Sequence, residues 1–359
     1  MKKMIWKPIV LFLLFVCSLS LQAQEKYEAP ELSDPDSWSV VLFPDPQTYV
    51  KFSRNQGILD LMTAWTAENV EKLNIGFVMC TGDMVEQNNL LSPDGKYVNV
   101  SSPKQWEAVS KAFGRFDGRV PYIVTTGNHD FGILSAENRR THFDDYFTPD
   151  KNLLNAKILR DVGLTEEGVP TLRNATYEYT TPQGKKILIL VLEFAPRDAA
   201  IEWAKGIVAQ DKYKEHEVFL LTHSYMNSDN ERFVKEGYKV EDANYGAAIW
   251  EKLIQPASNI RMVFAGHIGA PNEPKKHIGF RTDLNVAGKK VTQMVFNAQA
   301  LGGGWHGNGG DGWLRILEFL PDGKTVKVKT FSPLFAISPS TQHLAWRREA
   351  CDEFTFMID

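Results

Sequence analysis

The sequence predicts an α/β fold built around β-sheets, with helices on both sheet faces. Short apolar runs, typical of strands buried on both faces, alternate with stretches whose apolar residues repeat at helical spacing. The last part of the chain changes to strands with few helices between them. Apolar residues make up 43% of the 359 residues and charged residues 23%, a composition that supports an extensive core.

The expected elements follow in chain order. Strand-like runs occupy residues 39–43, 75–80, 120–125, 186–194, 217–221 and 261–265. Helical stripes fall near residues 58–73, 106–113, 198–209 and 247–253. Residues 88–104 and 131–185 are rich in Asn, Asp, Pro and Gly, so we expect loops or insertions over one sheet edge.

Strands near residues 291–297, 313–320 and 325–331 are expected to close a second sheet against the first. This interpretation gives one domain over residues 38–335, followed by a C-terminal segment at 336–359. Because a typical domain has about 150 residues, a chain of this length also allows two domains.

The first 23 residues have the pattern of a secretory signal peptide. Three lysines, at positions 2, 3 and 7, precede the apolar run at residues 9–17, and Ala23 supplies a small residue for cleavage. The apolar run is shorter than the ~18 residues that a membrane span needs. We therefore expect a secreted or periplasmic protein with a polar leader at 24–37 and no integral membrane segment. A lipoprotein attached through Cys17 is a weaker interpretation, because bulky Phe15 and Val16 precede it.

Charge argues against a nucleic-acid partner. The chain carries 44 acidic and 40 basic residues, and signal cleavage would remove three lysines and no acid. A nuclease would need a local basic patch, for instance around Arg139, Arg140 and Arg281.

Cys80 and Cys351 would be the cysteines left after cleavage, and two cysteines do not make a disulfide framework. Because Cys80 ends an apolar strand-like run, a buried free thiol is favoured over a pairing of the two.

Polar side chains follow five of the predicted strands. The carboxyl ends of strands in an open α/β sheet face one crevice, so these side chains are expected to meet there. They are Asp45 and Gln47, Asp83, Asn128, His223 and His267. Each alone is more often a turn residue or a structural histidine, but five such strand ends in succession indicate a site.

Carboxylates, amides and imidazoles without thiolates suit Mn, Fe, Zn or Mg. Two such cations sharing an aspartate, ~3.5–4 Å apart, are a usual means of holding a phosphoryl group.

These residues resemble the calcineurin-like metallophosphoesterase superfamily, in the subgroup whose first motif is Asp-Pro-Gln. The matching motifs, in the family's order, are Asp45-Pro46-Gln47, Gly82-Asp83, Gly127-Asn128-His129-Asp130, His223 and Gly266-His267. The resemblance implies a four-layer sandwich, with two central mixed sheets flanked by helices, and two divalent metal ions.

The resemblance also implies roles for individual residues. Asp83 resembles the carboxylate that bridges the two metals. Asn128, His223 and His267 match the ligands of one metal, and Asp45 with Gln47 matches the other. His129 resembles the phosphate-binding histidine that acts as general acid, oriented by Asp130 or by a backbone group.

Two positions depart from the family pattern. Gln47 stands where a histidine is usual, and Gly269 stands where the last motif has its second histidine. Both changes fall on the metal position of Asp45, which is therefore expected to bind weakly, to use water, or to recruit another group.

His306 lies in a Gly-rich segment and is a candidate substrate-binding residue beside Asn128 and His129. A solvent-exposed loop histidine is the simpler interpretation of His306. His306 is also a candidate for the ligand missing at Gly269, and His142 and His277 are weaker candidates for that role. Trp305 is expected either in a substrate wall or in a plain turn.

The favoured function is an exported phosphoesterase. It would hydrolyse a small-molecule or lipid-linked phosphate mono- or diester by attack of a metal-bound hydroxide, with His129 as the acid. The alternative is a degenerate binding protein on the same scaffold with an incomplete metal site.

Overall fold

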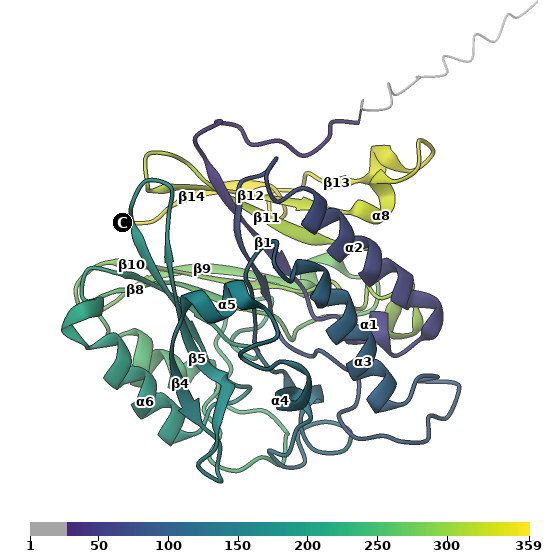
Figure 1. Cartoon of the computed structure of the whole chain (residues 1–359), viewed down its shortest axis with the longest axis horizontal. Coiled ribbons are helices and arrows are strands. Elements are labelled where there is room, and N and C mark those ends of the chain that lie inside the picture. Colours follow the sequence, from purple (N-terminus) through teal and green to yellow (C-terminus); the bar gives the residue numbers. More distant parts are fainter. Residues whose placement is uncertain (1–26) are drawn as a thin grey trace, which may run out of the picture.

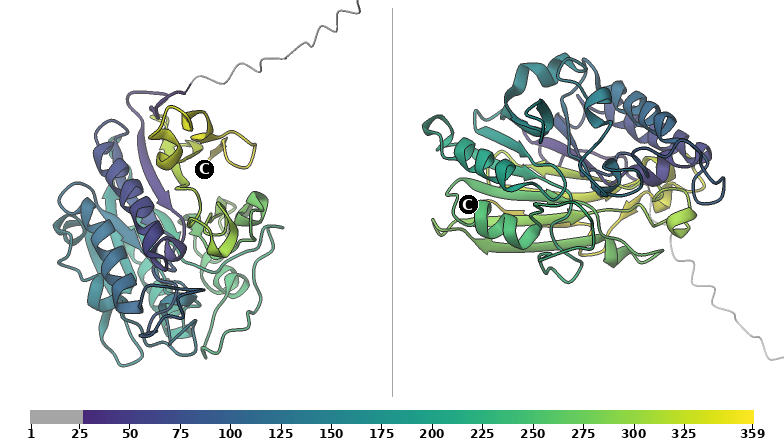
Figure 2. Two further views of the ribbon diagram at one scale, coloured as in Figure 1. Left: turned by 90° about the vertical axis from the view of Figure 1, so that its right-hand side faces the viewer. Right: turned by 90° about the horizontal axis from the view of Figure 1, so that it is seen from below.

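In the computed structural model, which describes residues 27–359, two seven-stranded sheets pack face to face. Helices lie outside both sheets, as Figure 1 and the edge-on view in Figure 2 show. The predicted fold class, a four-layer α/β sandwich with two mixed sheets, is confirmed. The predicted signal peptide, Cys17 and the start of the predicted leader lie outside the described residues.

The first sheet has the strand order β13-β12-β11-β1-β2-β3, with β14 also paired to β12. Strands β1, β2 and β3 are mutually parallel, and the remaining pairs are antiparallel. Its strands are β1 (Trp38–Phe43), β2 (Ile75–Cys80), β3 (Tyr122–Val124), β11 (Leu314–Phe319), β12 (Thr325–Phe331), β13 (Trp346–Arg347) and β14 (Phe354–Met357).

The second sheet has the order β4-β5-β6-β7-β8-β10-β9. Strands β6, β7, β8 and β10 are parallel at its centre, with antiparallel pairs at both edges. Its strands are β4 (Leu159–Leu164), β5 (Pro170–Thr180), β6 (Lys186–Val191), β7 (Glu217–Leu221), β8 (Ile260–Ala265), β9 (Ile278–Leu284) and β10 (Lys290–Phe296).

The longer helices cover the outer sheet faces. Helices α2 and α3 lie beside β1 and β2, and α6 lies over the second sheet (Figure 1). A π-helical segment, Trp250–Ile254, continues α7. The helices are α1 (Gln47–Val50), α2 (Gln56–Glu68), α3 (Ser102–Phe113), α4 (Phe143–Tyr146), α5 (Leu153–Ile158), α6 (Asp198–Val208), α7 (Gly246–Ile249) and α8 (Pro333–Ala336).

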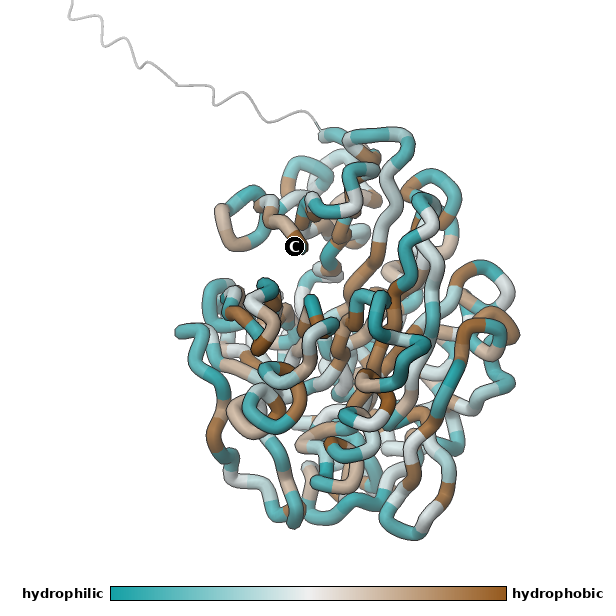
Figure 3. Tube along the Cα trace, turned by 90° about the vertical axis from the view of Figure 1, so that its left-hand side faces the viewer, coloured by the Kyte–Doolittle hydropathy of each residue, from teal (hydrophilic) through white to brown (hydrophobic). Residues whose placement is uncertain are grey.

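Strand β6 shows why its sequence is apolar without alternation. Ile187 and Ile189 face the core between the sheets, whereas Leu188 and Leu190 face the core beneath α6. A strand covered on both faces needs apolar residues at every position. Figure 3 shows these apolar stretches in the interior and hydrophilic residues along many of the loops.

Aromatic rings join the two sheets. Phe319 of β11 stacks on Trp38 of β1 at 4.3 Å between ring centroids and on Phe219 of β7 at 5.9 Å. Gly76 of β2 leaves room for Tyr179 of β5, whose hydroxyl would lie 2.4 Å from a Cβ at position 76. The missing side chain at position 76 therefore lets Tyr179 of the second sheet pack against the first sheet.

Two expectations about the sheets were wrong. Residues 131–185 are not all loop, because they contain the helices α4 and α5 and the strands β4 and β5, and these two strands lie at one edge of the second sheet. The strands after residue 290 do not build a second sheet of their own. Strand β10 joins β8, whereas β11 and β12 extend the first sheet from β1.

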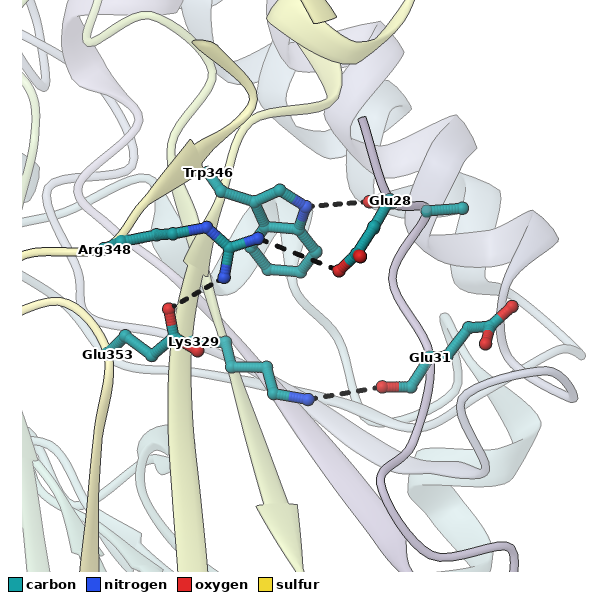
Figure 4. A pocket seen from close by; sticks show the side chains of 7 residues that line it. Glu28, Glu31, Lys329, Trp346, Arg348 and Glu353 are labelled. Carbon is teal, nitrogen blue, oxygen red and sulfur yellow. Dashed lines mark hydrogen bonds and ion pairs between the residues drawn. The ribbon is translucent and has the colours of Figure 1, made fainter. Parts of the chain in front are cut away.

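The segment around Glu28 and Glu31 packs against the C-terminal strands (Figure 4). Trp346 donates its indole N–H to the Glu28 carbonyl at 2.8 Å, and Lys329 donates to the Glu31 carbonyl at 3.3 Å. The described part of the leader is therefore bound to the first sheet.

Cys80 and Cys351 are both free thiols, and Cys80 is buried, as predicted. Within residues 27–359 no helix combines the length and apolar character that crossing a bilayer requires.

Candidate metal centre

The polar side chains predicted from the strand ends meet at one edge of the sandwich. Asp45 follows β1, Asp83 follows β2, Asn128 lies beyond β3, His223 follows β7 and His267 follows β8. The two sheets contribute strand ends from the same side, so residues more than 200 positions apart come into contact. The predicted convergence is present.

Four of these residues point donor atoms at a common centre. The Nε2 atom of His223 lies 3.1 Å from the Asn128 Oδ1 atom, 3.2 Å from the His267 Nδ1 atom and 3.3 Å from the Asp83 Oδ2 atom. His267 Nδ1 lies 3.0 Å from Asn128 Oδ1. Donor atoms bonded to one metal at about 2.1 Å lie about this far apart. Asp83, His223 and His267 form a group that could hold a metal ion.

Each of these donor atoms is fixed by a hydrogen bond at the opposite end of its side chain. His223 donates Nδ1–H to the Thr81 carbonyl at 2.7 Å, which leaves Nε2 unprotonated in the neutral ring. Asn128 donates its amide to Ser135 at 2.8 Å, which turns its oxygen toward the histidines. Such outer contacts orient metal ligands.

Glu236 is a site residue that sequence reasoning missed. Its Oε1 atom accepts from His267 Nε2 at 2.7 Å, and its other oxygen accepts from the Ser224 hydroxyl. A carboxylate–histidine pair of this kind fixes the tautomer and makes the ligating nitrogen more basic. Glu236 lies in an irregular stretch between β7 and α7, where a single acid gives no signal in the sequence.

Local backbone strain holds two ligands in place. Asp83 has φ +50° and His267 has φ +77°, a region that side-chain-bearing residues seldom adopt. The glycines around them allow the close approach. A Cβ at Gly127 would lie 2.0 Å from the Asp83 Oδ1 atom, and one at Gly266 would lie 2.1 Å from the Asp45 Oδ1 atom.

The charges within the site favour a cation. Burial raises the pKa of Asp45 to about 6, against the opposing effect of His223. Burial also acts to raise the pKa of Asp83, but the nearby His223 and His129 outweigh it and hold that pKa below its usual range. Burial acts to lower the pKa of His223, yet Asp83 and Asp45 raise it to about 10. The carboxylates therefore stabilise positive charge at the position of the imidazole.

His129 is placed to act on a ligand in the cavity. Its backbone N–H donates to Asp83 at 2.9 Å, and its ring Nδ1 lies 2.6 Å from the Glu86 carbonyl. Donation from Nδ1 leaves Nε2 as the second ring nitrogen. Burial acts to lower the pKa of His129, but Asp83 and Glu86 raise it overall.

The His129 ring was expected to be oriented by Asp130 or by a backbone group. The structure shows the backbone carbonyl of Glu86 in this position, and the Asp130 carboxylate bonds elsewhere. That carboxylate is fully buried and accepts from the backbone N–H groups of Gly127 at 2.7 Å and Val85 at 3.1 Å. Burial and the charge of Asp83 raise its pKa to about 7. Asp130 links the two loops that carry Asp83 and Asn128.

A cavity of about 560 Å³ opens over this centre. It is lined by Gln47, Lys51, Asp83, Glu86, Asn128, His129, Asn227, Ser228, Phe233, Tyr238, His267, Ile268, Gly269, Ala270, Lys276, Gln299 and Trp305. The cavity lining therefore combines two lysines and several aromatic rings with the candidate ligands Asp83, Asn128 and His267, which form its base. Asp45 and His223 do not line the cavity and are fully buried.

Trp305 lines the cavity, whereas His306 is exposed and absent from its wall. The His306 ring packs against Tyr97 at 5.1 Å between centroids, and its carbonyl accepts from Arg54 at 2.6 Å. The solvent-exposed interpretation of His306 fits this placement, and its role in substrate binding stays a prediction.

Of the three arginines suggested for a local basic patch, Arg140 is exposed. Arg139 is buried and bonded to backbone carbonyls, and Arg281 is paired with Asp283 at 2.7 Å.

Comparison with known proteins identifies the family. Residues 39–271 match the family model for calcineurin-like phosphoesterases. The chain belongs to the calcineurin-like phosphoesterase family. Members of this family are metal-dependent phosphoesterases that typically bind two metal ions.

A curated relative, the uncharacterized protein YvnB of Bacillus subtilis, is 25% identical over 299 residues. That match covers 83% of this chain but 20% of YvnB, so the chain spans about a fifth of the length of that relative.

Two solved structures resemble the chain more distantly. A dimetal phosphatase from Danio rerio aligns with a TM-score of 0.48 and 11% identity, over 91% of this chain and 100% of that one. GAP50, the anchor in the inner membrane complex of Plasmodium, aligns with a TM-score of 0.45 and 9% identity, over 87% and 88%. At TM-scores below 0.5 neither structure bears on the site.

Proposed function

We propose that this chain is a metal-dependent phosphoesterase that hydrolyses a phosphate mono- or diester. The observation that carries the proposal is the convergence of Asp83, Asn128, His223 and His267 beneath an open cavity that His129 also lines. The donor set fits a divalent cation, because two imidazole nitrogens and two oxygens face one centre with their other polar atoms already satisfied. When bound, the cation supplies Lewis-acid activation of water and of the phosphoryl group.

The chain's own residues would bind and orient the ester. Lys51 and Lys276 line the cavity and attract an anionic group, while Phe233, Tyr238 and Trp305 form its apolar wall. Lys51 is almost fully buried and paired with Glu86 at 2.9 Å, so its charge is held in place. This combination suits a phosphate group attached to an organic moiety.

His129 would hold a proton at Nε2 for the leaving oxygen, because its Nδ1 atom is engaged by the Glu86 carbonyl. Its raised pKa favours the protonated ring near neutral pH. Replacing His129 with alanine should lower kcat by roughly 10²–10⁴-fold while leaving the metal content unchanged.

The test uses one phosphomonoester and one phosphodiester, with protein treated with a chelator and then supplied with Mn²⁺, Mg²⁺ or Zn²⁺. His142→Ala is the matched control, since His142 lies on an exposed loop and pairs with Asp145. Metal-dependent turnover that His129→Ala abolishes and His142→Ala retains supports the enzyme. Absence of turnover with every metal, despite bound metal, would instead favour the alternative, a binding protein whose metal site is incomplete at Gly269.

Export is part of the proposal. The charged start, short apolar run and Ala23 support cleavage of a signal peptide. Mass spectrometry of protein produced from the full-length gene should find Gln24 as the first residue, and retention of residues 1–23 would contradict export by this route.

A further inference from the structure

Two buried amide oxygens beside the metal centre have no hydrogen-bond partner. They are the Oε1 atoms of Gln47 and Gln299, and their residues are 2% and 3% exposed. Both glutamines line the cavity. A buried acceptor left without a donor costs about 1–3 kcal/mol, so such atoms indicate a missing partner.

Both amides lie against the carboxylates expected at the second metal position, the one assigned to Asp45. Gln47 places its Nε2 atom 2.9 Å from Asp83 Oδ2, and Gln299 places its Nε2 atom 3.4 Å from Asp45 Oδ2. The terminal torsion of a glutamine is soft, so each amide can rotate and place its oxygen where its nitrogen now lies, beside the carboxylate. Asp45 Oδ1 accepts a single hydrogen bond, from the Thr81 hydroxyl, and keeps a lone pair.

The place of the absent histidine cannot be filled from position 269. A Cβ at Gly269 would lie 2.5 Å from the ring of the buried His277. His277 itself is held by the backbone of Ala270, at 2.9 Å from its Nε2 atom to the carbonyl. The imidazoles of His223 and His267 face the other metal position.

Gln299 reaches the site because β10 is parallel to β8. The strand ends at Phe296, and the following Asn297 side chain accepts from the backbone N–H groups of Ala298 and Gln299, which bends the chain. Asn297 also donates to Asp45 Oδ2 at 2.6 Å. The turn thus carries Gln299 to the carboxylate.

We propose that Gln299 supplies the ligand missing at Gly269, so that the second metal position has only oxygen donors, from Asp45, Gln47, Asp83 and Gln299. Oxygen donors without imidazole favour hard cations such as Mg²⁺ and Mn²⁺ over Zn²⁺. This inference rests on the proposed function, because it assumes that the family's second metal position is in use. It predicts one position selective for Mn²⁺ or Mg²⁺ beside one that also accepts Zn²⁺.

The test measures metal binding rather than turnover. Protein stripped with a chelator is titrated calorimetrically with Mn²⁺ and, separately, with Zn²⁺, and bound metal is counted by elemental analysis. We expect two Mn²⁺ per chain with separate affinities, and one Zn²⁺ at the same free concentration. Gln299→Leu should weaken the second Mn²⁺ at least tenfold and leave the first unchanged, whereas Gln299→Glu should strengthen the second.

Gln183→Leu is the matched control, because Gln183 is exposed and distant in the fold. Thermal unfolding of each variant without metal separates misfolding from ligand loss. Binding of one Mn²⁺ at saturation, or a second Mn²⁺ that Gln299→Leu does not weaken, would overturn the proposal. Two Mn²⁺ with the expected Gln299 dependence but no hydrolysis would contradict the proposed function and leave this inference standing.

Discussion

Gly127 shows how one missing side chain controls the candidate centre. A Cβ there would lie 2.0 Å from Asp83 Oδ1 and 2.5 Å from the Asp83 backbone nitrogen, so Gly127→Ala must displace Asp83. We expect metal affinity to fall at least tenfold, measured by calorimetry. Gly57→Ala is the matched control, since nothing lies within 4 Å of a Cβ there. Helix α2 should gain about 0.5–1 kcal/mol from that control. Equal metal affinity in the two variants would contradict this role for Gly127.

His277 should make the protein less stable in mild acid. Burial lowers its pKa from 6.5 to about 4, so the folded state favours the neutral form of the ring. The free energy of unfolding is therefore not reduced by this group above pH 6.5. It falls as the pH drops toward 4, by up to about 3 kcal/mol. Denaturant unfolding of wild type and His277→Gln at pH 7 and pH 4.5 measures the difference. A loss of stability in acid that is as large in His277→Gln would show that other groups cause it.

Sequence reasoning located the candidate ligands that follow recognisable strands and missed the site residues that depend on tertiary packing. Asp45, Asp83, Asn128, His223 and His267 follow apolar runs, so their convergence could be predicted. Gln299 also follows a strand, and extending the same rule to residues 291–297 would have found it. Glu236 lies in an irregular loop, and its role follows from contact with His267. The exposed position of His306, in contrast, agrees with the simpler interpretation of its Gly-rich segment.

At the scale of elements, strand content was predictable but sheet membership was not. Strand β5 contains Arg173, Asn174 and Glu178, so its sequence does not read as an apolar run. It forms because β4 pairs with its residues from Pro170 to Tyr177 and β6 pairs with Ala175–Thr180. Strands β10 and β11 are consecutive but belong to different sheets, because the Gly-rich turn between them crosses from one sheet to the other.

Strand β11 supports a prediction about the packing between sheets. Phe319 stacks on Trp38 and Phe219, so Phe319→Ala should lower the free energy of unfolding by about 3–5 kcal/mol through the cavity it leaves. Phe319 pairs with Trp38, at the opposite end of β1 from Asp45, so metal affinity of the folded variant should be unchanged. Chemical denaturation and calorimetry measure the two quantities. A loss below 1 kcal/mol would mean that the ring stack contributes little.

At the scale of the whole molecule, the candidate site is a product of two sheets packed with their strand ends on one side. Asp45, Asp83 and Asn128 come from the first sheet, and His223, His267 and Gln299 come from the second. Neither sheet alone supplies a complete donor set. Metal binding should therefore stabilise the packing of the sheets, since a ligand that binds only the folded state adds to its stability.

We propose that these strand ends together form a metal centre. Anomalous diffraction from a crystal loaded with Mn²⁺, recorded above and below the manganese absorption edge, tests it most directly. We expect a peak about 2.0–2.3 Å from Asp83 Oδ2, Asn128 Oδ1, His223 Nε2 and His267 Nδ1. A difference map with no peak between these four atoms at saturating Mn²⁺ would contradict it.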